Sequence, residues 1–378
     1  MRKMRVLLVL ALFLLPVTGA WAQGGAGVPV PGACIDGALP SGALSKICIP
    51  QSGWNGDLLL YAHGYVPNLP GVPLDFYNLT LPDGTYVPTL VQSLGFAFAT
   101  TSYRQNGLSI LEGVDDIREL VADFDAQYGP PRRRFLTGVS EGGLVTTLAA
   151  ERSPELFTGA YATCGPIGNF RYQINYLGDM RVLFDYFFPG VIPGSVVDVP
   201  LGVVAMWESY YVPAIGALLA ANPSRAIQLM RTANAPYEAG DFATVVATTI
   251  NALSYNIYAT GDAIAKLGGN PFDNRLRWYS GSSNDFLLNR QVQRFAASPV
   301  AVEAMRPYTS SGNLRIPLVT LHTTKDEIVP YPHELLYAAK VRPSARGRFL
   351  PLPVFRYGHC NFTATEVLAG LGLLIVQP

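Results

Sequence analysis

A serine between two glycines constrains this chain more than any other feature. The segment 136–143 reads LTGVSEGG, which places Ser140 between Gly138 and Gly142. A predicted buried strand at 133–137 precedes it, and a helical stretch rich in alanine and leucine at 143–151 follows it. This order predicts a sharp turn that holds the serine hydroxyl above the end of a sheet. Glycine is expected at 138 and 142 because a Cβ there would collide with neighbouring backbone. Ser140 is therefore a candidate nucleophile, and the alternative is an ordinary turn.

The N-terminus has the pattern of an export signal. Three basic residues (Arg2, Lys3 and Arg5) precede an apolar stretch at 6–17, and the segment 20–22 (AWA) fits a cleavage site. The stretch is too short to cross a bilayer comfortably, and no other run of about 18 uncharged apolar residues follows. We expect residues 1–22 to be a removed signal peptide, the protein to be secreted or periplasmic, and no stable membrane anchor to remain.

Charge and composition limit the partners of the exported chain. Loss of residues 1–22 removes three basic residues and no acidic residue, which leaves 24 Lys and Arg against 27 Asp and Glu. This near-neutral balance argues against nucleic acid or an anionic membrane surface as a partner. Since 49% of residues are hydrophobic and 14% are charged, a large core or an apolar binding surface is expected. The pattern makes no prediction of oligomeric state.

Four cysteines are expected to form two disulfides, because an even count in an exported chain favours pairing. Cys34 and Cys48 lie close together across a loop rich in Gly, Pro and Ser, so they form one plausible pair. By elimination Cys164 would pair with Cys360. No metal site or cofactor is predicted, since the chain has four histidines and no CxxC or HxxxH spacing.

Short apolar runs alternate with helical periodicities, which is typical of the α/β class with a mostly parallel central sheet flanked by helices. The strands are expected at 57–62, 96–101, 133–137, 157–163, 316–321 and 349–355, and the helices at 112–128, 143–151 and 366–376. The alternation stops between 166 and 312, where helical runs such as 214–220 and 243–253 follow an aromatic-rich part. We expect a helical lid at 166–312 between two parts of one core, 23–165 and 313–378. Its aromatic residues would form its own core, line an apolar substrate pocket, or both.

A serine hydroxyl becomes a good nucleophile when a histidine accepts its proton and a carboxylate orients that histidine. His359 lies in a loop between the last predicted strand and the last helix, and Asp326 closely follows the strand 316–321. Glu327 is the alternative acid. His322 is an alternative base, although it would lie at the same strand end as the acid.

The other two histidines are weaker candidates. His63 is expected to be structural, holding its turn through side-chain hydrogen bonds, and His333 has no supporting context.

These residues resemble those of the α/β-hydrolase superfamily, in which the chain order is Ser, Asp or Glu, then His. Ser140, Asp326 and His359 follow that order. The segment 326–330 (DEIVP) resembles the family's D-x-x-V-P segment after the seventh strand, and the histidine follows the eighth. The resemblance covers roughly 45–165 and 313–378. It implies the α/β-hydrolase fold, with the helical lid inserted after the sixth strand.

The resemblance also implies an oxyanion hole, a pair of backbone N–H groups that binds the negative oxygen of the transition state. His63 and Gly64 resemble the family's turn after the third strand, which makes the N–H of Tyr65 one donor. The N–H of Glu141, the residue after the nucleophile, is the other. The charge of Glu141 beside the nucleophile has no explanation from the sequence.

Cys360, directly after His359, resembles the tannase and feruloyl-esterase group, where a disulfide ties such a cysteine to one before the serine. This chain departs from that pattern, since residue 139 is Val139.

The resemblance implies a secreted serine hydrolase that cleaves carboxylic esters, either small or polymer-derived. The alternative is a serine peptidase, because the segment 140–143 (SEGG) also resembles the elbow of prolyl-peptidase-like enzymes. Such a peptidase would need acidic anchors for a free N-terminus, and the candidates are Asp179, Asp185, Asp198, Glu208, Glu238 and Asp241. A further alternative is an inactive hydrolase fold used as a binding module.

Overall fold

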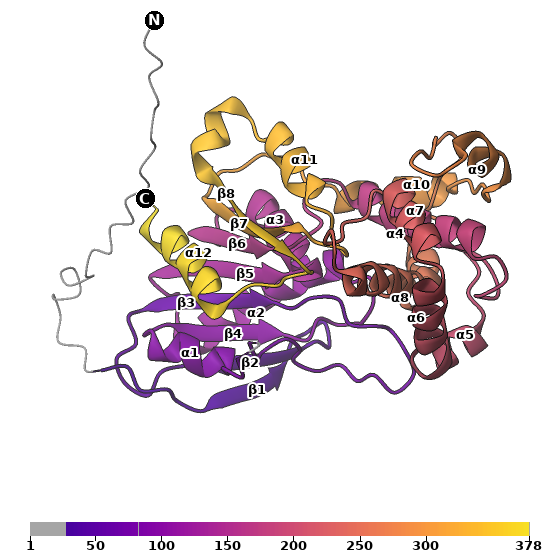
Figure 1. The fold of residues 1–378 in the computed structure, drawn as a ribbon. Coiled ribbons are helices and arrows are strands. Elements are labelled where there is room, and N and C mark those ends of the chain that lie inside the picture. Colours follow the sequence, from indigo (N-terminus) through magenta and orange to yellow (C-terminus); the bar gives the residue numbers. More distant parts are fainter. Residues whose placement is uncertain (1–27, 82, 378) are drawn as a thin grey trace, which may run out of the picture.

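A single eight-stranded sheet organises the protein. The structure, a computed structural model, describes residues 28–81 and 83–377, so the predicted signal peptide lies outside the described residues. The strand order is β1-β2-β4-β3-β5-β6-β7-β8, and β2 runs opposite to the other seven (Figure 1). The strands are β1 (Cys34–Ala38), β2 (Leu44–Cys48), β3 (Asp57–Ala62), β4 (Ala97–Thr101), β5 (Arg133–Val139), β6 (Gly159–Thr163), β7 (Leu318–Lys325) and β8 (Phe349–Tyr357). This order is that of the α/β-hydrolase fold, which confirms the predicted fold class.

Helices cover both faces of the sheet. On one face lie α2 (Ile110–Tyr128), α3 (Glu141–Arg152) and α11 (Pro332–Lys340); on the other lie α1 (Val87–Ser93) and α12 (Ala364–Val376). The inner strands β3, β4 and β6 are buried on both sides because both sides are covered. In β3, Leu58 and Leu60 pack with α2 and α3, whereas Leu59 packs in the core that holds α1 and α12. The alternation of side chains along a strand thus builds two cores from one sheet.

A helical segment, here called the helical insertion, joins β6 to β7 and lies beside the carboxyl ends of the parallel strands (Figure 1). It contains α4 (Phe170–Phe187), α5 (Leu201–Met206), η1 (Trp207–Tyr211), α6 (Val212–Ala221), α7 (Pro223–Ala233), α8 (Phe242–Leu267), α9 (Asp285–Gln291), α10 (Pro299–Ala304) and η2 (Arg306–Tyr308). It has its own hydrophobic core, in which Phe184, Phe187 and Trp207 are buried. Many of the aromatic residues in this segment therefore serve to hold the insertion together. The run Leu201–Ala221 is also long and apolar enough, by length and composition alone, to span a membrane.

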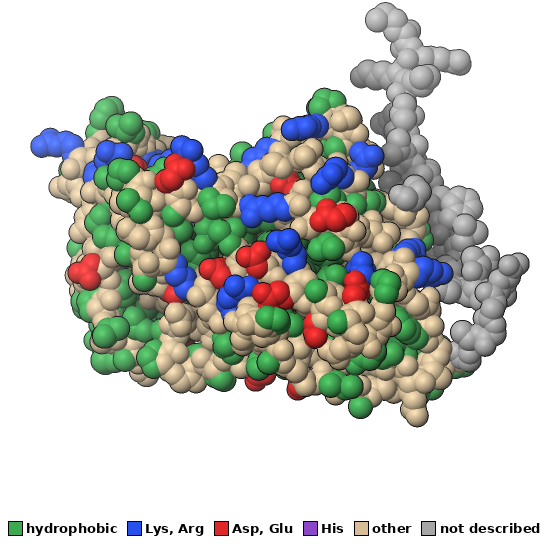
Figure 2. Space-filling view, turned by 180° about the vertical axis from the view of Figure 1, so that it is seen from behind, with side chains coloured by type: hydrophobic (Ala, Val, Ile, Leu, Met, Phe, Trp, Pro, Cys, Tyr) green, Lys and Arg blue, Asp and Glu red, His purple; other side chains and the backbone are tan. Residues whose placement is uncertain are grey.

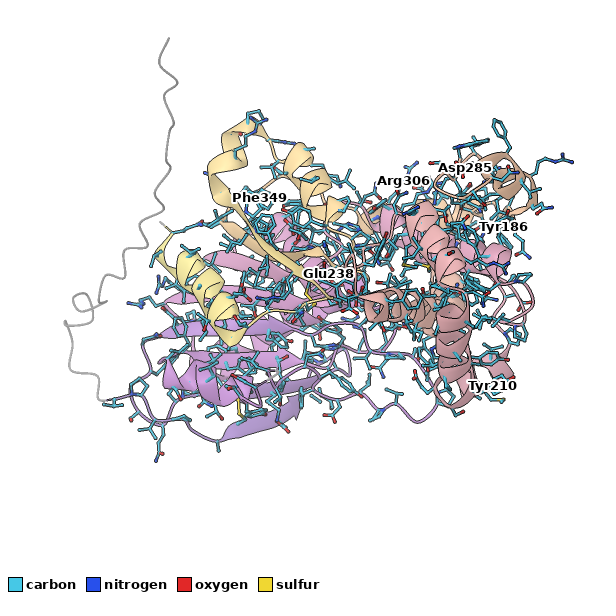
Figure 3. All side chains as sticks on the ribbon, in the orientation of Figure 1. Tyr186, Tyr210, Glu238, Asp285, Arg306 and Phe349 are labelled. Atoms are coloured by element: carbon cyan, nitrogen blue, oxygen red, sulfur yellow. A yellow bond between two sulfur atoms is a disulfide. The ribbon has the colours of Figure 1, made fainter. Side chains whose placement is uncertain are left out.

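Polar contacts tie the insertion to the sheet. Glu238 forms an ion pair with Lys325 at the end of β7, and it lies at the boundary between the two parts in Figure 3. In the same view Tyr186 and Tyr210 lie far from the sheet. On the face shown in Figure 2, acidic and basic side chains are intermingled, as the balanced composition leads one to expect.

The sequence missed one part of the sheet. The stretch between Cys34 and Cys48 was expected to be a loop, but it forms the hairpin of β1 and β2, with these two cysteines directly opposite each other. Most of β1 is exposed, so its sequence lacks the apolar alternation that marks a half-buried strand. The helix expected at 243–253 is the N-terminal part of a longer helix, α8.

Candidate active site

The turn between β5 and α3 positions Ser140 by close backbone packing. Ser140 has φ +56°, a backbone conformation that side chains rarely adopt. A Cβ on Gly138 would lie 2.1 Å from the carbonyl oxygen of Gly142, and a Cβ on Gly142 would lie 2.1 Å from that of Ala62. The predicted need for glycine at both positions is therefore confirmed. The strained turn raises the serine above the end of β5.

The structure brings the three predicted side chains into one hydrogen-bonded chain. His359 Nε2 lies 2.9 Å from Ser140 Oγ, and His359 Nδ1 lies 2.8 Å and 2.9 Å from the two carboxylate oxygens of Asp326. The three residues follow the carboxyl ends of the parallel strands β5, β7 and β8, which lie at one edge of the sheet with β6 between β5 and β7. With Asp326 accepting from Nδ1–H, Nε2 is left free to accept the serine proton.

Asp326 is held as a buried carboxylate. It has no exposed surface, and its Oδ1 accepts hydrogen bonds from the N–H groups of Ile328 and Val329 at 2.9 Å and 2.8 Å. Burial alone would raise the pKa of Asp326, but the neighbouring imidazoles of His359 and His322 outweigh it and hold the pKa well below its usual range. Asp326 is thus ionised at any pH at which the protein is expected to work.

His322 supports Asp326 from beneath, a contact that the sequence analysis missed. Its Nε2 lies 2.8 Å from the carbonyl oxygen of Val329 and 3.4 Å from Asp326, and its Nδ1 lies 3.2 Å from Glu334. Both ring nitrogens face acceptors, so both carry a proton. Burial disfavours this imidazolium, but hydrogen bonds to Asp326 and Glu334 raise the pKa of His322 to about 10. The sequence carries no signal for this contact, because it depends on how α11 packs against β7.

The alternative site residues lie elsewhere. Glu327 directs its carboxylate to the side-chain amide of Asn251 at 3.0 Å. His63 is buried, with its ring nitrogens 2.6 Å and 3.1 Å from the carbonyl oxygens of Gly64 and Ser102, in line with a structural role.

His333 joins α11 to the start of the helical insertion. Its Nδ1 accepts from the N–H groups of Gly168 and Asn169 at 3.2 Å and 3.3 Å, and its Nε2 lies 3.1 Å from Gln173 Oε1. Burial and the nearby His322 lower the pKa of His333 to about 3, so it is neutral.

The two predicted oxyanion donors flank Ser140. Glu141 begins α3, so its N–H has no acceptor within that helix. The turn that carries Tyr65 approaches Ser140 closely, because a Cβ on Gly64 would lie 3.3 Å from the Ser140 Cβ. Both N–H groups therefore belong to backbone segments that pack against the serine.

The side chain of Glu141 is buried and turns away from the serine to accept the N–H of Ser109 at 2.9 Å. Burial raises the pKa of Glu141 to about 8, against the opposing effect of that hydrogen bond. The carboxyl group is thus mostly neutral at pH 7. This accounts for an acidic residue beside a site where negative charge would develop.

A disulfide lies next to His359. Cys164, just after β6, is bonded to Cys360, and Cys34 is bonded to Cys48, so both predicted pairs form. The Cys360 sulfur lies 3.3 Å from His359 Nε2. In the described part of the chain, Cys164, His359 and Cys360 are grouped closely enough to ligate a metal ion. The two sulfurs are joined in a disulfide and are not free thiolates, so this group does not fit a metal.

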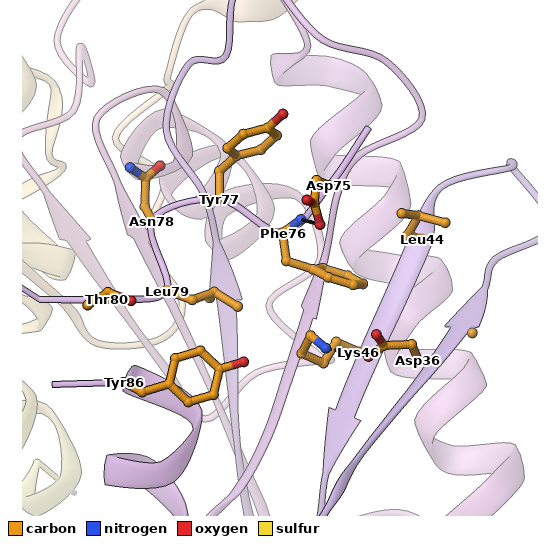
Figure 4. Close-up of a pocket in the computed structure, with 11 residues that line it drawn as sticks. Asp36, Leu44, Lys46, Asp75, Phe76, Tyr77, Asn78, Leu79, Thr80 and Tyr86 are labelled. Carbon is orange, nitrogen blue, oxygen red and sulfur yellow. Dashed lines mark hydrogen bonds and ion pairs between the residues drawn. The ribbon is translucent and has the colours of Figure 1, made fainter. Parts of the chain in front are cut away.

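A small cavity opens at Ser140, between the sheet and the helical insertion. It has a volume of about 80 Å³ and is mostly apolar, and Tyr65, Glu141 and Tyr255 also line it. A larger open hollow of about 700 Å³ lies beside β1 and β2 (Figure 4). None of Ser140, Asp326 and His359 lines that hollow, so the small cavity is the one relevant to their chemistry.

Comparisons with known proteins give a fold likeness only. No family model matches the chain, and no curated protein sequence matches it. Among solved structures, it resembles feruloyl esterase B from Aspergillus oryzae, with 14% sequence identity and a TM-score of 0.47, over 86% of this chain and 73% of that chain. It also resembles a Pyrococcus furiosus esterase, with 9% identity and a TM-score of 0.47, over 91% of this chain and 88% of that chain. A third similar structure is Pyrococcus horikoshii acylaminoacyl peptidase, with 14% identity and a TM-score of 0.44 over 88% of this chain. The match covers 38% of the peptidase, so this chain spans less than two fifths of its length. Because these sequence identities and TM-scores are low, the fold is assigned from the sheet topology and not from these similar structures.

Proposed function

We propose that this protein is an exported serine hydrolase that cleaves carboxylic esters by acyl transfer to water. The observation that carries the proposal is the chain of hydrogen bonds from Ser140 through His359 to Asp326, with Ser140 on a strained turn at the mouth of a mostly apolar cavity. The two disulfides fit an oxidising compartment, and the predicted signal peptide at 1–22 supports export.

The reaction has two steps. Ser140 Oγ attacks the ester carbonyl carbon while His359 Nε2 takes the hydroxyl proton, and the N–H groups of Glu141 and Tyr65 bind the resulting oxyanion. The tetrahedral intermediate collapses, the ester C–O bond breaks, and His359 gives its proton to the departing alcohol. A water molecule then attacks the acyl-serine with His359 as base, which releases the acid and restores Ser140. Asp326 orients the imidazole and stabilises its charged form.

The acidic residues of the helical insertion favour an ester over a peptide with a free N-terminus. Asp179 pairs with Arg277, Asp185 with Arg181, and Glu238 with Lys325. None of the six candidate anchors lines the cavity at Ser140, and the carboxyl that does, Glu141, is mostly neutral. A cationic amino group would therefore lack a counter-charge there.

Initial rates on p-nitrophenyl esters and on aminoacyl p-nitroanilides test this proposal. We expect turnover of the esters, little turnover of the anilides, and a loss of at least about 10⁴-fold in kcat for Ser140→Ala. Ser224→Ala, at an exposed serine, is the matched control. Preference for the anilides would favour the peptidase. A folded protein inert to both classes would favour a binding module.

A further inference from the structure

We infer that the cavity at Ser140 holds the acyl part of the substrate and limits it to a short chain of about four carbon atoms or fewer. This inference rests on the proposed ester hydrolysis and adds its substrate class. It depends on which side of Ser140 the cavity lies, how large it is, and what forms its walls.

The position of the cavity identifies the part of the ester that enters it. His359 must give its proton to the leaving alcohol, so the alcohol lies on the side of the imidazole. Ser140 and both residues of the proposed oxyanion hole, Tyr65 and Glu141, line the cavity, whereas His359 does not. With the carbonyl oxygen held by those two N–H groups, the cavity receives the substituent opposite the alcohol, which is the acyl chain.

The size of the cavity sets the length of that chain. Its volume of about 80 Å³ is roughly half of the 150 Å³ of an engineered apolar cavity that takes up benzene, a molecule of six carbons. About three carbons beyond the carbonyl therefore fit, which corresponds to a butyryl group.

The walls are apolar and well supported. They comprise Leu108 and Ile110 near the start of α2, Phe170, Ile174 and Leu177 from α4, and Ala263 from α8, among others. Leu108, Ile110, Phe170 and Ala263 are themselves almost fully buried in the main core, so the cavity cannot widen on that side without disturbing the core. This lining matches an apolar acyl chain.

The wall between this cavity and a neighbouring one can be altered by mutation. A second cavity of about 50 Å³ adjoins it, and five residues, including Ile174, Leu177 and Ala259, line both. Leu177→Ala would join the two cavities and lengthen the space for the chain. Ala259→Leu would fill the space instead.

The test is the dependence of kcat/KM on acyl length, measured with p-nitrophenyl acetate, propionate, butyrate, hexanoate and octanoate. For the unmodified protein we expect a rise of about fourfold per methylene up to butyrate, since each added methylene is buried. From butyrate to hexanoate we expect a fall of at least about tenfold, because the longer chain does not fit.

The variants sharpen this test. We expect Leu177→Ala to move the optimum to hexanoate, and Ala259→Leu to lose activity on butyrate more than on acetate. Leu183→Ala, a buried leucine on α4 that lines neither cavity, and Ala265→Leu, an exposed position on α8, are the matched controls and should keep the original optimum.

Two outcomes would overturn the inference. One is a kcat/KM that stays level or rises through octanoate in the unmodified protein. The other is a Leu177→Ala optimum identical to that of Leu183→Ala. Absence of hydrolysis of every ester by folded protein would instead overturn the proposed function, so the two failures are distinguishable.

Discussion

Removal of the disulfide between Cys164 and Cys360 should lower the stability of the fold by an amount that can be calculated from the length of the loop it closes. The bond joins residues 196 apart in sequence, so in the chain-entropy treatment it stabilises the fold by about 5 kcal/mol. The bond between Cys34 and Cys48 joins residues 14 apart and contributes about 3 kcal/mol. For about 350 residues these free energies correspond to falls in melting temperature of roughly 7 °C and 4 °C.

The two disulfides also differ in what they hold. Cys164 and Cys360 both have a positive φ, +46° and +50°, and Cys360 directly follows His359. Loss of the cross-link lets this strained loop relax and carry the imidazole away from Ser140. Since a displacement of 1 Å at a reacting group costs up to about 100-fold in rate, activity should fall together with stability.

The assay compares two double variants, Cys164→Ser with Cys360→Ser and Cys34→Ser with Cys48→Ser. Melting temperature is measured by calorimetry and kcat on a p-nitrophenyl ester at 25 °C. We expect the first variant to melt lower than the second and to be the only one with a reduced kcat. The reasoning is refuted if the first variant melts no lower than the second, or if both Cys164 and Cys360 of the exported protein react with a thiol reagent before reduction.

Three further predictions concern the site. Asp326→Asn should lower kcat by about 10⁴-fold, because the amide cannot hold the required tautomer of His359; a kcat within tenfold of the original would contradict that role. It should also lower the melting temperature, because the buried His322 imidazolium loses the charge of its carboxylate partner. Glu141→Gln should keep its activity at pH 7, since the native carboxyl is mostly neutral there. The pKa of Glu141 is raised from 4.5 to about 8 in the folded state, so the folded state binds this proton more tightly than the unfolded state does. The stability gained from the protonated carboxyl is therefore full below pH 4.5 and is lost as pH rises through 8, by roughly 5 kcal/mol in total. Melting temperatures from pH 5 to 9 should therefore fall less steeply in Glu141→Gln than in the native protein, and parallel curves would contradict the buried neutral carboxyl. Tyr65→Ala should retain most of its kcat, because the proposed oxyanion donor is the backbone N–H; a loss as large as that of Ser140→Ala would assign the chemistry to the phenol instead.

The sequence predicted the strands that are buried along their whole length. Strands such as β3 and β4 are apolar runs covered on both faces, and their predicted bounds differ from the observed ones by at most one residue. Strand β1 was missed because four of its five residues are exposed. Strand β2 has only five residues, two of which are the polar Ser45 and Lys46, so it shows no apolar period. The short helix α1 gives too few turns to show a periodicity.

For the active site too, residues in a local sequence pattern were predicted, whereas contacts that depend on tertiary packing were not. Ser140, Asp326 and His359 were predicted because each follows a strand end in a recognisable local pattern, and strand ends of a parallel sheet meet at one edge. The support of Asp326 by His322 and Glu334 was not predicted, since it depends on how α11 packs beneath β7. The neutral state of Glu141 likewise depends on burial, which the local sequence does not encode.

The most direct test of the central claim is covalent labelling of the serine. Native protein is treated with a fluorophosphonate, which forms an O–P bond to an activated serine with loss of fluoride, and the adduct is located by peptide mass spectrometry. We predict a single adduct on Ser140, formed far more slowly in His359→Ala and absent after denaturation. Folded protein that remains unlabelled at Ser140, or that is labelled at another residue instead, would contradict the claim.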